Sequence, residues 1–478
     1  MVKSSNTYAR PLYKPVLLIA GLIILSTVCV LLLSTSTSFF HSYREQLDSM
    51  VYQVIGREWL SGVLPYRDLW DLKGPLVFFI NALGFLLTDS RYGILIIQVI
   101  FLFVSLLLVS SYLKKRVSYL KSFVGCIIIC CTLATVYEGG NMVEEYILPF
   151  LYLSFIFMNR WIENIGEGNY EHKWSYGLVY GLTFAFALYT RLTNALPLCA
   201  GVAYIAVILI YKRKWINLLC NMLAFIAGFL LIVIPFLIYF YLTDTILDYW
   251  ASIIFCFKYL SLSNHTLDFK KLILFNFPIF LLMIVIIINY LYIKNLHKLF
   301  FWSIVSFVSL YWFINSRGYN HYSIIFLPYM VIALYEIAQL GKRWQIFLCL
   351  IVLLYIVRAV KHDLTYYNEL DDVKKSNLII NEMMNTVPEP DRANTLIYGD
   401  IISPYLYQEI CPSKYFYLQD ENASISPYYK KMMLVDFYRV RPKYIITGSI
   451  ADNIKGILDS YYSLLYEDSY AMVYKRLD

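Results

Sequence analysis

Residues 216–242 read INLLCNMLAFIAGFLLIVIPFLIYFYL, an apolar run without one charged side chain. A helix needs about 20 such residues to cross the hydrocarbon core of a bilayer. Comparable runs recur along the chain, which is 59% hydrophobic and only 15% charged, whereas soluble proteins carry about 25% charged residues. The composition therefore predicts a multi-pass membrane protein. It excludes a cytosolic enzyme, a disordered chain and a disulfide-stapled secreted module.

Eleven segments are apolar and long enough to span a bilayer, or nearly so. A further apolar stretch, 75–88, is short for a span and more typical of a re-entrant or interfacial helix. The predicted spans are residues 15–37, 91–113, 119–136, 144–159, 174–190, 194–211, 216–242, 271–293, 299–315, 321–340 and 344–360.

The distribution of basic residues predicts the orientation. If residues 75–88 stay on one side, alternate loops collect fifteen Lys and Arg residues against three acids. Basic loops stay in the cytoplasm, so we expect a multi-pass protein of the plasma (cytoplasmic) membrane with a cytoplasmic amino terminus. The net charge of +7 is then a topology signal, and no nucleic-acid partner is implied. The polar clusters of unusual composition all fall on the outer face, where we expect the chemistry.

The chain is predicted to divide into a membrane domain, residues 1–360, and a small extracytoplasmic α/β domain, residues 361–478. Helical periodicity stops after 360, and short strand-like runs alternate with helical stretches. We expect this domain to recognise an acceptor or to cover the outer cavity. The expected strands are 395–399, 415–418, 444–448 and a hairpin of 462–466 with 470–474, and the expected helices are 365–385, 403–410, 427–440 and 451–459.

The first outer cluster follows the first span. Residues 42–45 match a helix capping box, and the apolar spacing after them predicts an amphipathic helix over 43–61 that lies on the outer membrane surface. Asp48 sits near its start. An ordinary ion pair with Arg44 one turn away and a role in the chemistry are both open at this point.

The second cluster is residues 64–75, LPYRDLWDLKGP. Its aromatic rings are typical of interfacial anchors, but two carboxylates and two bases within seven residues exceed what anchoring requires. Lys73 or Arg67 is suited to binding a phosphate, while Asp68 and Asp71 orient the bases or a hydroxyl. For this cluster, a structural role as a membrane anchor and a functional role in binding are about equally favoured.

Three more clusters lie on the same face. Glu144 and Glu145 open a span and point roughly 100° apart, so only one faces a given cavity; the helix dipole accounts for one acid there. Arg191 interrupts two apolar runs, as a snorkelling side chain also does. Arg317 and His321, one helical turn apart, suit a phosphate, and His321 as a metal ligand is the lesser alternative.

Together these clusters resemble the bacterial GT-C membrane glycosyltransferases, in particular the branch of the dolichyl-phosphate-mannose protein mannosyltransferases and the lipid A aminoarabinose transferase. The most specific element is the run from Pro65 to Pro75, and the resemblance covers residues 1–360 and, more loosely, the α/β domain. It implies a polyprenyl-monophosphate-linked sugar as donor, transferred with inversion to a glycan, lipid or protein acceptor, with membrane lipids as surroundings.

The resemblance also implies roles for single residues. Asp48 takes the place of the catalytic aspartate, a general base on the acceptor hydroxyl. Relatives often carry a second acid directly after it, where this chain has Ser49. This departure weakens a metal-bridging role and leaves metal dependence open, so a divalent cation is a possibility and no cofactor is certain.

By the same resemblance, Glu144 or Glu145 corresponds to the second acidic position and Lys73 to the base that holds the donor phosphate. Arg317 and His321 would hold that phosphate as it leaves.

Two alternatives remain at the level of the sequence. A flippase or transporter for lipid-linked sugars is also multi-spanning, but it predicts charged or broken helices near the middle of the membrane. An O-antigen-type polymerase shares the donor class but typically lacks the carboxyl-terminal domain.

Overall fold

The computed structural model describes residues 13–41, 47–166, 168–261, 269–316, 319–338, 354, 357, 370–407, 410–448, 451–468 and 471–477, apart from the side chains of 259–279, 282 and 370–377. Arg44, Arg317 and most of the predicted span 344–360 lie outside the described residues.

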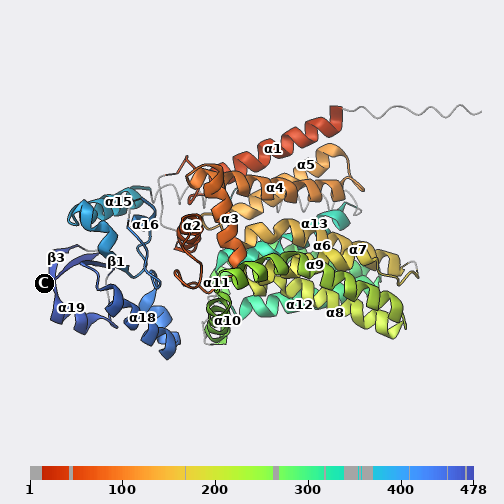
Figure 1. The fold of residues 1–478 in the computed structure, drawn as a ribbon. Coiled ribbons are helices and arrows are strands. Elements are labelled where there is room, and N and C mark those ends of the chain that lie inside the picture. The colour runs from red at the N-terminus through yellow and green to blue at the C-terminus, as the bar shows by residue number, and fades with distance from the viewer. Residues whose placement is uncertain are drawn as a thin grey trace, which may run out of the picture.

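A bundle of long helices forms the membrane domain (Figure 1). The bundle helices run side by side, and most of their boundaries follow the predicted spans to within a few residues. Its elements are α1 (Tyr13–Leu33), α4 (Arg91–Leu113), α5 (Tyr119–Ala134), α6 (Val143–Gly166), α7 (Trp174–Leu188), η1 (Leu192–Ala195), α8 (Leu196–Tyr211), α9 (Trp215–Leu242), α11 (Phe269–Tyr292), α12 (Leu296–Ile314), η2 (Asn320–Phe326) and α13 (Leu327–Ile337).

The described residues contain five stretches long and apolar enough to cross a bilayer. They make this a multi-pass membrane protein, while the predicted count of eleven spans stays a prediction. The five are Tyr13–Leu33, Arg91–Leu113, Leu192–Tyr211, Trp215–Leu242 and Leu296–Ile314.

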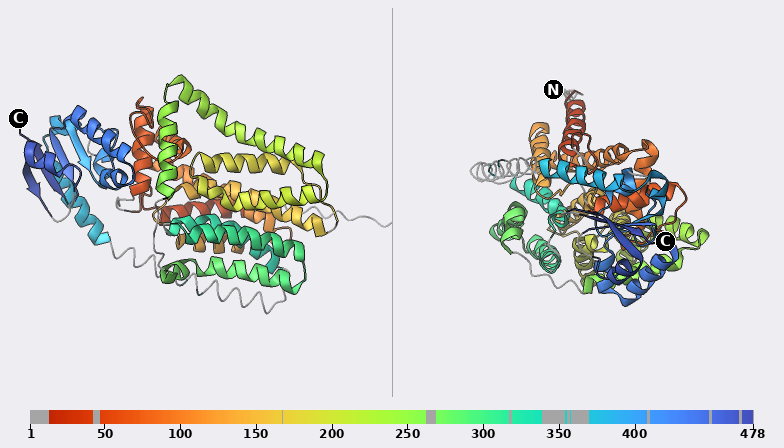
Figure 2. Two further views of the ribbon diagram at one scale, coloured as in Figure 1. Left: turned by 90° about the horizontal axis from the view of Figure 1, so that it is seen from below. Right: turned by 90° about the vertical axis from the view of Figure 1, so that its left-hand side faces the viewer.

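Three helices lie across one end of the bundle, between it and the carboxyl-terminal domain (Figures 1 and 2). They are α2 (Leu47–Leu60), α3 (Pro75–Leu87) and α10 (Ile246–Ser261). The first two match the predicted surface helix and the short apolar stretch. Helix α10 was not predicted separately; it forms inside the polar loop 243–270 and buries Tyr249.

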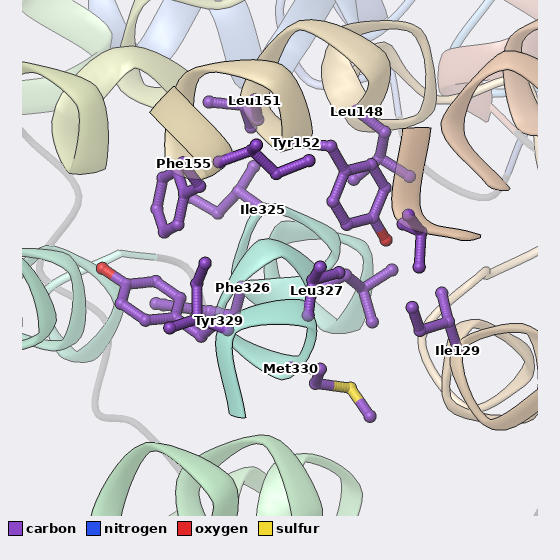
Figure 3. Packing of buried hydrophobic residues seen from close by; sticks show 14 of the residues in the cluster. Ile129, Leu148, Leu151, Tyr152, Phe155, Ile325, Phe326, Leu327, Tyr329 and Met330 are labelled. Carbon is purple, nitrogen blue, oxygen red and sulfur yellow. The ribbon is translucent and has the colours of Figure 1, made fainter. Parts of the chain in front are cut away.

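The main core surrounds α6, whose residues are buried on nearly every side. Figure 3 shows Leu148, Tyr152 and Phe155 of this helix facing Phe326 and Tyr329. The rings of Phe155 and Tyr329 meet edge to face, with centroids 4.9 Å apart, an arrangement that aromatic quadrupoles favour. Helix α6 is therefore the central element of the bundle, and its first turn lies at the end of the bundle next to the carboxyl-terminal domain.

Helices α7 and α9 approach each other through glycine. A Cβ atom on Gly181 would lie 1.9 Å from the carbonyl oxygen of Phe225, and one on Gly228 would lie 2.0 Å from that of Leu178. Small residues allow such close backbone packing between membrane helices. The contact fixes α7, after whose end the chain enters the loop that holds Arg191.

The carboxyl-terminal domain contains a four-stranded sheet in the order β1-β2-β4-β3. Strands β1 and β2 pair in parallel, and β3 and β4 form the predicted antiparallel hairpin. The elements are α15 (Leu370–Asn385), η3 (Glu389–Asn394), β1 (Thr395–Tyr398), α16 (Ser403–Tyr407), α17 (Gln419–Ile425), α18 (Pro427–Val440), β2 (Tyr444–Thr447), α19 (Lys455–Tyr461), β3 (Tyr462–Glu467) and β4 (Met472–Arg476).

One predicted strand, 415–418, is wrong. This segment joins no strand. The N–H of Leu418 donates to the carbonyl of Gly399 at 2.8 Å, and the hydroxyl of Tyr417 donates to Asp71 of the membrane domain at 2.6 Å. The N–H of Trp70 donates to the carbonyl of Lys414 at 2.9 Å, and Leu418 adopts a left-handed conformation with φ 44°, which breaks an extended run.

The two domains share a hydrophobic cluster. Met50 and Val54 of α2 pack in one group with Ile397 and Ile402 of the carboxyl-terminal domain. Arg57 of α2 adds two hydrogen bonds, to the carbonyl oxygens of residues 405 and 406 at 2.5 and 2.9 Å. Helix α2 is thus the platform on which the carboxyl-terminal domain rests.

The glycine contact generates a stability prediction. We expect Gly181→Ala to lower the melting temperature of the detergent-purified protein, because neither backbone can yield to the new Cβ; overpacking costs about 1–3 kcal/mol. Gly166→Ala is the control, since a Cβ there meets no atom within 4 Å. Equal melting temperatures for the two variants would contradict the close approach of α7 and α9.

Candidate functional site

A cavity of about 400 Å³ opens where one end of the bundle meets the carboxyl-terminal domain. Its polar side comes from Asp48, Lys73, Glu138, Arg191 and His321, and Tyr417 and Glu421 line it from the carboxyl-terminal domain. The rest of the lining is largely apolar. Charges on an apolar floor at a membrane boundary suit a ligand with a polar head and a hydrophobic tail.

An ion pair between Asp48 and Lys73 lies in this cavity, with Nζ 3.3 Å from Oδ2. Burial raises the pKa of Asp48, but Lys73 and His321 outweigh it and hold the pKa below its usual value. Burial lowers the pKa of Lys73, whereas Asp48 and Tyr52 raise it well above normal. Both groups are therefore charged at neutral pH, and the Asp48 side chain keeps 38% of its surface open to the cavity.

The backbone around Gly74 positions Lys73. The N–H of Gly74 donates to the carbonyl of Thr190 at 3.1 Å, and a Cβ on Gly74 would lie 2.2 Å from the carbonyl of Tyr189. Only glycine fits that approach. The hydroxyl of Tyr66 also donates to the Lys73 carbonyl at 2.8 Å, so the lysine stands on a backbone fixed on both sides.

Asp71 fastens the same loop to the carboxyl-terminal domain. Its carboxylate accepts the hydroxyl of Tyr417 at 2.6 Å and the N–H of Lys73 at 2.6 Å. Burial raises the pKa of Asp71 to about 6, against the lowering effect of Lys73 and the Tyr417 hydrogen bond. Asp71 does not line the cavity; it holds two of the residues that do.

Arg191 is the second cation of the cavity. Its Nη1 pairs with Oε1 of Glu144 at 3.0 Å, and its guanidinium lies over the ring of Tyr322, 3.4 Å from the centroid. Glu144 is completely buried, so the pair orients the arginine from below and leaves its other face to the cavity.

Glu145 points elsewhere. Its carboxylate accepts hydrogen bonds from the Tyr137 hydroxyl at 2.6 Å, the Gln98 amide at 2.9 Å and the Met142 N–H at 2.9 Å. These bonds tie α6 to α4 and to the loop between α5 and α6. Of the two adjacent acids, Glu144 is the one that contacts a residue of the cavity.

Glu138 belongs to the site and was not among the predicted site residues. It pairs with His321 and accepts the N–H of Asn320 at 3.0 Å. Burial raises the pKa of Glu138, but His321 and the backbone hydrogen bonds together outweigh burial and hold the pKa below its usual value. The consecutive glycines of Glu-Gly-Gly-Asn were the available signal for a turn here, though not for its partner; in the structure Glu138 has a φ of 46°.

Arg67 and Asp68 lie outside this cavity. They pair with each other at 2.9 Å and line a second cavity on the side of the carboxyl-terminal domain. No group of three His, Cys, Asp or Glu side chains arranged to hold a metal ion occurs among the described residues. Metal dependence stays open.

The pKa of Asp71 generates a prediction for pH dependence. The folded-state pKa of about 6 exceeds the ordinary 3.8, so the folded state binds more protons and loses stability as pH rises from about 4 to 6, by about 3 kcal/mol. We expect Asp71→Asn, which mimics the protonated acid, to flatten the melting temperature over this window. If Asp71→Asn shows the same dependence of melting temperature on pH as the wild type, the raised pKa of Asp71 is contradicted.

The fold is similar to that of ArnT, a GT-C glycosyltransferase. ArnT from Cupriavidus metallidurans, solved with undecaprenyl phosphate, superposes with a TM-score of 0.59 at 11% identity over 97% of this chain and 98% of that one. The Archaeoglobus fulgidus oligosaccharyltransferase tethered to an acceptor peptide gives a TM-score of 0.48 at 11% identity, over 98% and 74%.

The predicted resemblance is thus confirmed for the fold. No curated protein matches the chain. The profile of the putative competence-induced protein Ccs4 N-terminal domain matches residues 10–345, and the chain therefore belongs to this family.

Proposed function

We propose that the protein is a glycosyltransferase that moves a sugar from a polyprenyl-monophosphate donor to a hydroxyl group of a glycan, lipid or protein acceptor at the outer membrane face. The observation that carries the proposal is the Asp48–Lys73 pair in a cavity that is polar on one side and apolar on the other. The GT-C fold supports it. A flippase needs no carboxylate of this kind next to its phosphate-binding cation.

Asp48 acts as the general base. The acceptor oxygen attacks the anomeric carbon, its proton passes to the Asp48 carboxylate, and the bond from that carbon to the phosphate oxygen breaks. Attack opposite the leaving phosphate inverts the anomeric centre. The low pKa of Asp48 keeps it ionised before the reaction, and its exposure to the cavity leaves room for the acceptor.

Lys73 and Arg191 hold the phosphate. The leaving polyprenyl phosphate gains negative charge as the bond breaks, and fixed cations stabilise that charge. Glu144 and Tyr322 keep Arg191 in place, while Glu138 holds His321 at the same wall. Arg317, outside the described residues, stays a predicted phosphate ligand.

The proposal includes a cytoplasmic amino terminus and an extracytoplasmic domain after residue 360. The cavity and the carboxyl-terminal domain lie at the same end of the bundle. If that domain is outside the cell, the cavity also faces the outer side, where the lipid-linked donor and the acceptor meet. The contact through Tyr417 supports a role for that domain as the cover of the cavity and the acceptor side of the site.

Asp48→Asn tests the base. We expect a loss of transfer of at least about 100-fold with donor binding largely retained, because the amide cannot take the proton. The assay supplies a polyprenyl-phosphate sugar and candidate acceptors to purified protein and follows released polyprenyl phosphate. Asp244→Asn, at a position that does not line the cavity, is the control. Wild-type turnover in Asp48→Asn removes Asp48 from the mechanism, and lipid flipping without transfer refutes the proposal.

Lys73→Ala tests the phosphate contact. We expect the apparent donor affinity to fall by about tenfold or more while acceptor affinity changes little, since a charge-assisted contact is worth roughly 1.5–3 kcal/mol. Lys455→Ala, an exposed lysine of α19, is the matched control. An unchanged donor affinity in Lys73→Ala assigns the phosphate to other residues.

A further inference from the structure

A second cavity, of about 680 Å³, lies between the loop 64–75 and the carboxyl-terminal domain. Arg67 and Asp68 form one wall, and the other wall comes from the segment 411–415 and from α18. We call it the outer groove. Its volume falls within the roughly 300 to 1,000 Å³ typical of ligand sites, and none of the residues assigned to the reaction lines it.

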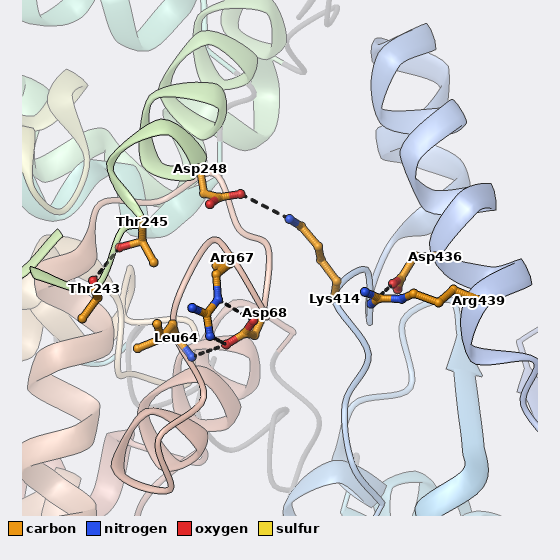
Figure 4. Close-up of polar contacts among 9 residues, drawn as sticks. All are labelled: Leu64, Arg67, Asp68, Thr243, Thr245, Asp248, Lys414, Asp436 and Arg439. Carbon is orange, nitrogen blue, oxygen red and sulfur yellow. Dashed lines mark hydrogen bonds and ion pairs between the residues drawn. The ribbon is translucent and has the colours of Figure 1, made fainter. Parts of the chain in front are cut away.

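The charges of the outer groove are paired one to one, as Figure 4 shows. Arg67 binds Asp68 through two hydrogen bonds of 2.9 and 3.0 Å. Lys414 pairs with Asp248 of α10 at 3.4 Å, a carboxylate just behind the lining. The wall is therefore polar but close to neutral, which disfavours a polyanionic ligand.

Arg439 and Asp436 of α18 complete the pattern, 2.5 Å apart. Arg439 keeps 74% of its side chain exposed and Arg67 keeps 48%. A guanidinium carries five N–H donors, and within the described part of the chain each arginine uses only some of them, so both present donors and a neighbouring acceptor to the groove. Donor–acceptor pairs of this kind match the hydroxyl groups of a sugar.

The outer groove is connected to the first cavity by two segments. The loop 64–75 lines the groove at Asp68 and the first cavity at Lys73, and the segment 411–422 lines the groove at Tyr415 and the first cavity at Tyr417. The segments bond to each other between the cavities through the Trp70 N–H. The groove and the first cavity therefore share the backbone segment that carries Lys73.

We propose that the outer groove binds a neutral oligosaccharide, the part of the acceptor glycan remote from the hydroxyl that receives the sugar. This proposal rests on the proposed transferase function, since it names the acceptor class of that reaction. Arg67, Asp68 and Arg439 bind sugar hydroxyl groups, and Tyr415 supplies an aromatic edge.

Binding without donor tests the groove separately from catalysis. The full-length protein in detergent is applied to an array of neutral hexose and N-acetylhexosamine oligosaccharides and their sulfated counterparts. We expect binding to neutral members, reduced about tenfold or more in Arg67→Ala/Arg439→Ala. Lys431→Ala, an exposed lysine of α18 that does not line the groove, should bind as the wild type does.

Two further measurements keep the test independent of folding. Val435→Trp adds bulk at an exposed lining position and should block binding without lowering the melting temperature. Cys411, exposed and part of the lining, should be alkylated more slowly when the best array ligand is bound.

Preference for sulfated members, absence of neutral binding, or full binding by Arg67→Ala/Arg439→Ala overturns the proposal. Oligosaccharide binding without any sugar transfer refutes the transferase function but supports the binding role of the groove. Sugar transfer without oligosaccharide binding supports the transferase function but refutes the binding role of the groove.

Discussion

Asp71 is a buried carboxylate with 2% of its surface exposed, and burying such a group is unfavourable unless donors satisfy it. One donor is the N–H of Lys73, on the loop between α2 and α3, and the other is the hydroxyl of Tyr417, from the carboxyl-terminal domain. The requirement to satisfy one acid therefore joins the two domains and fixes the backbone of the cavity lysine. Asp48 gains its partner only because this loop is held.

The same constraint repeats around the cavity. Glu144 is buried and needs Arg191, and Glu138 is held by His321. Burying an unpaired charge near the membrane carries a large free-energy penalty, so such charges are stable there only when they are paired. Pairing places both cations of the site on one wall, and the apolar remainder of the cavity is left for a hydrophobic ligand tail.

Part of the candidate site could be predicted from the sequence. Asp48 and Lys73 stood out because charges are rare in this chain and cluster at one face, and the run from Pro65 to Pro75 carried the family resemblance. Which acid of the pair at 144 and 145 faces the site was open, since periodicity separates the two directions without saying which one meets Arg191. Glu138 was missed because its partner His321 is 183 residues away, and no local pattern signals such a contact.

The fold divides in the same way. Apolar runs and basic loops determined by themselves that the chain crosses a membrane many times, because the free energy of burying apolar side chains in lipid depends on local composition. The short strand-like runs after residue 360 likewise indicated the sheet that the structure forms there. Only the tertiary structure decided that 415–418 lies outside the sheet, with Tyr417 bonded to the loop 64–75. It also decided that α10 lines the cavity. Both depend on contacts between residues far apart in the sequence, which local composition does not specify.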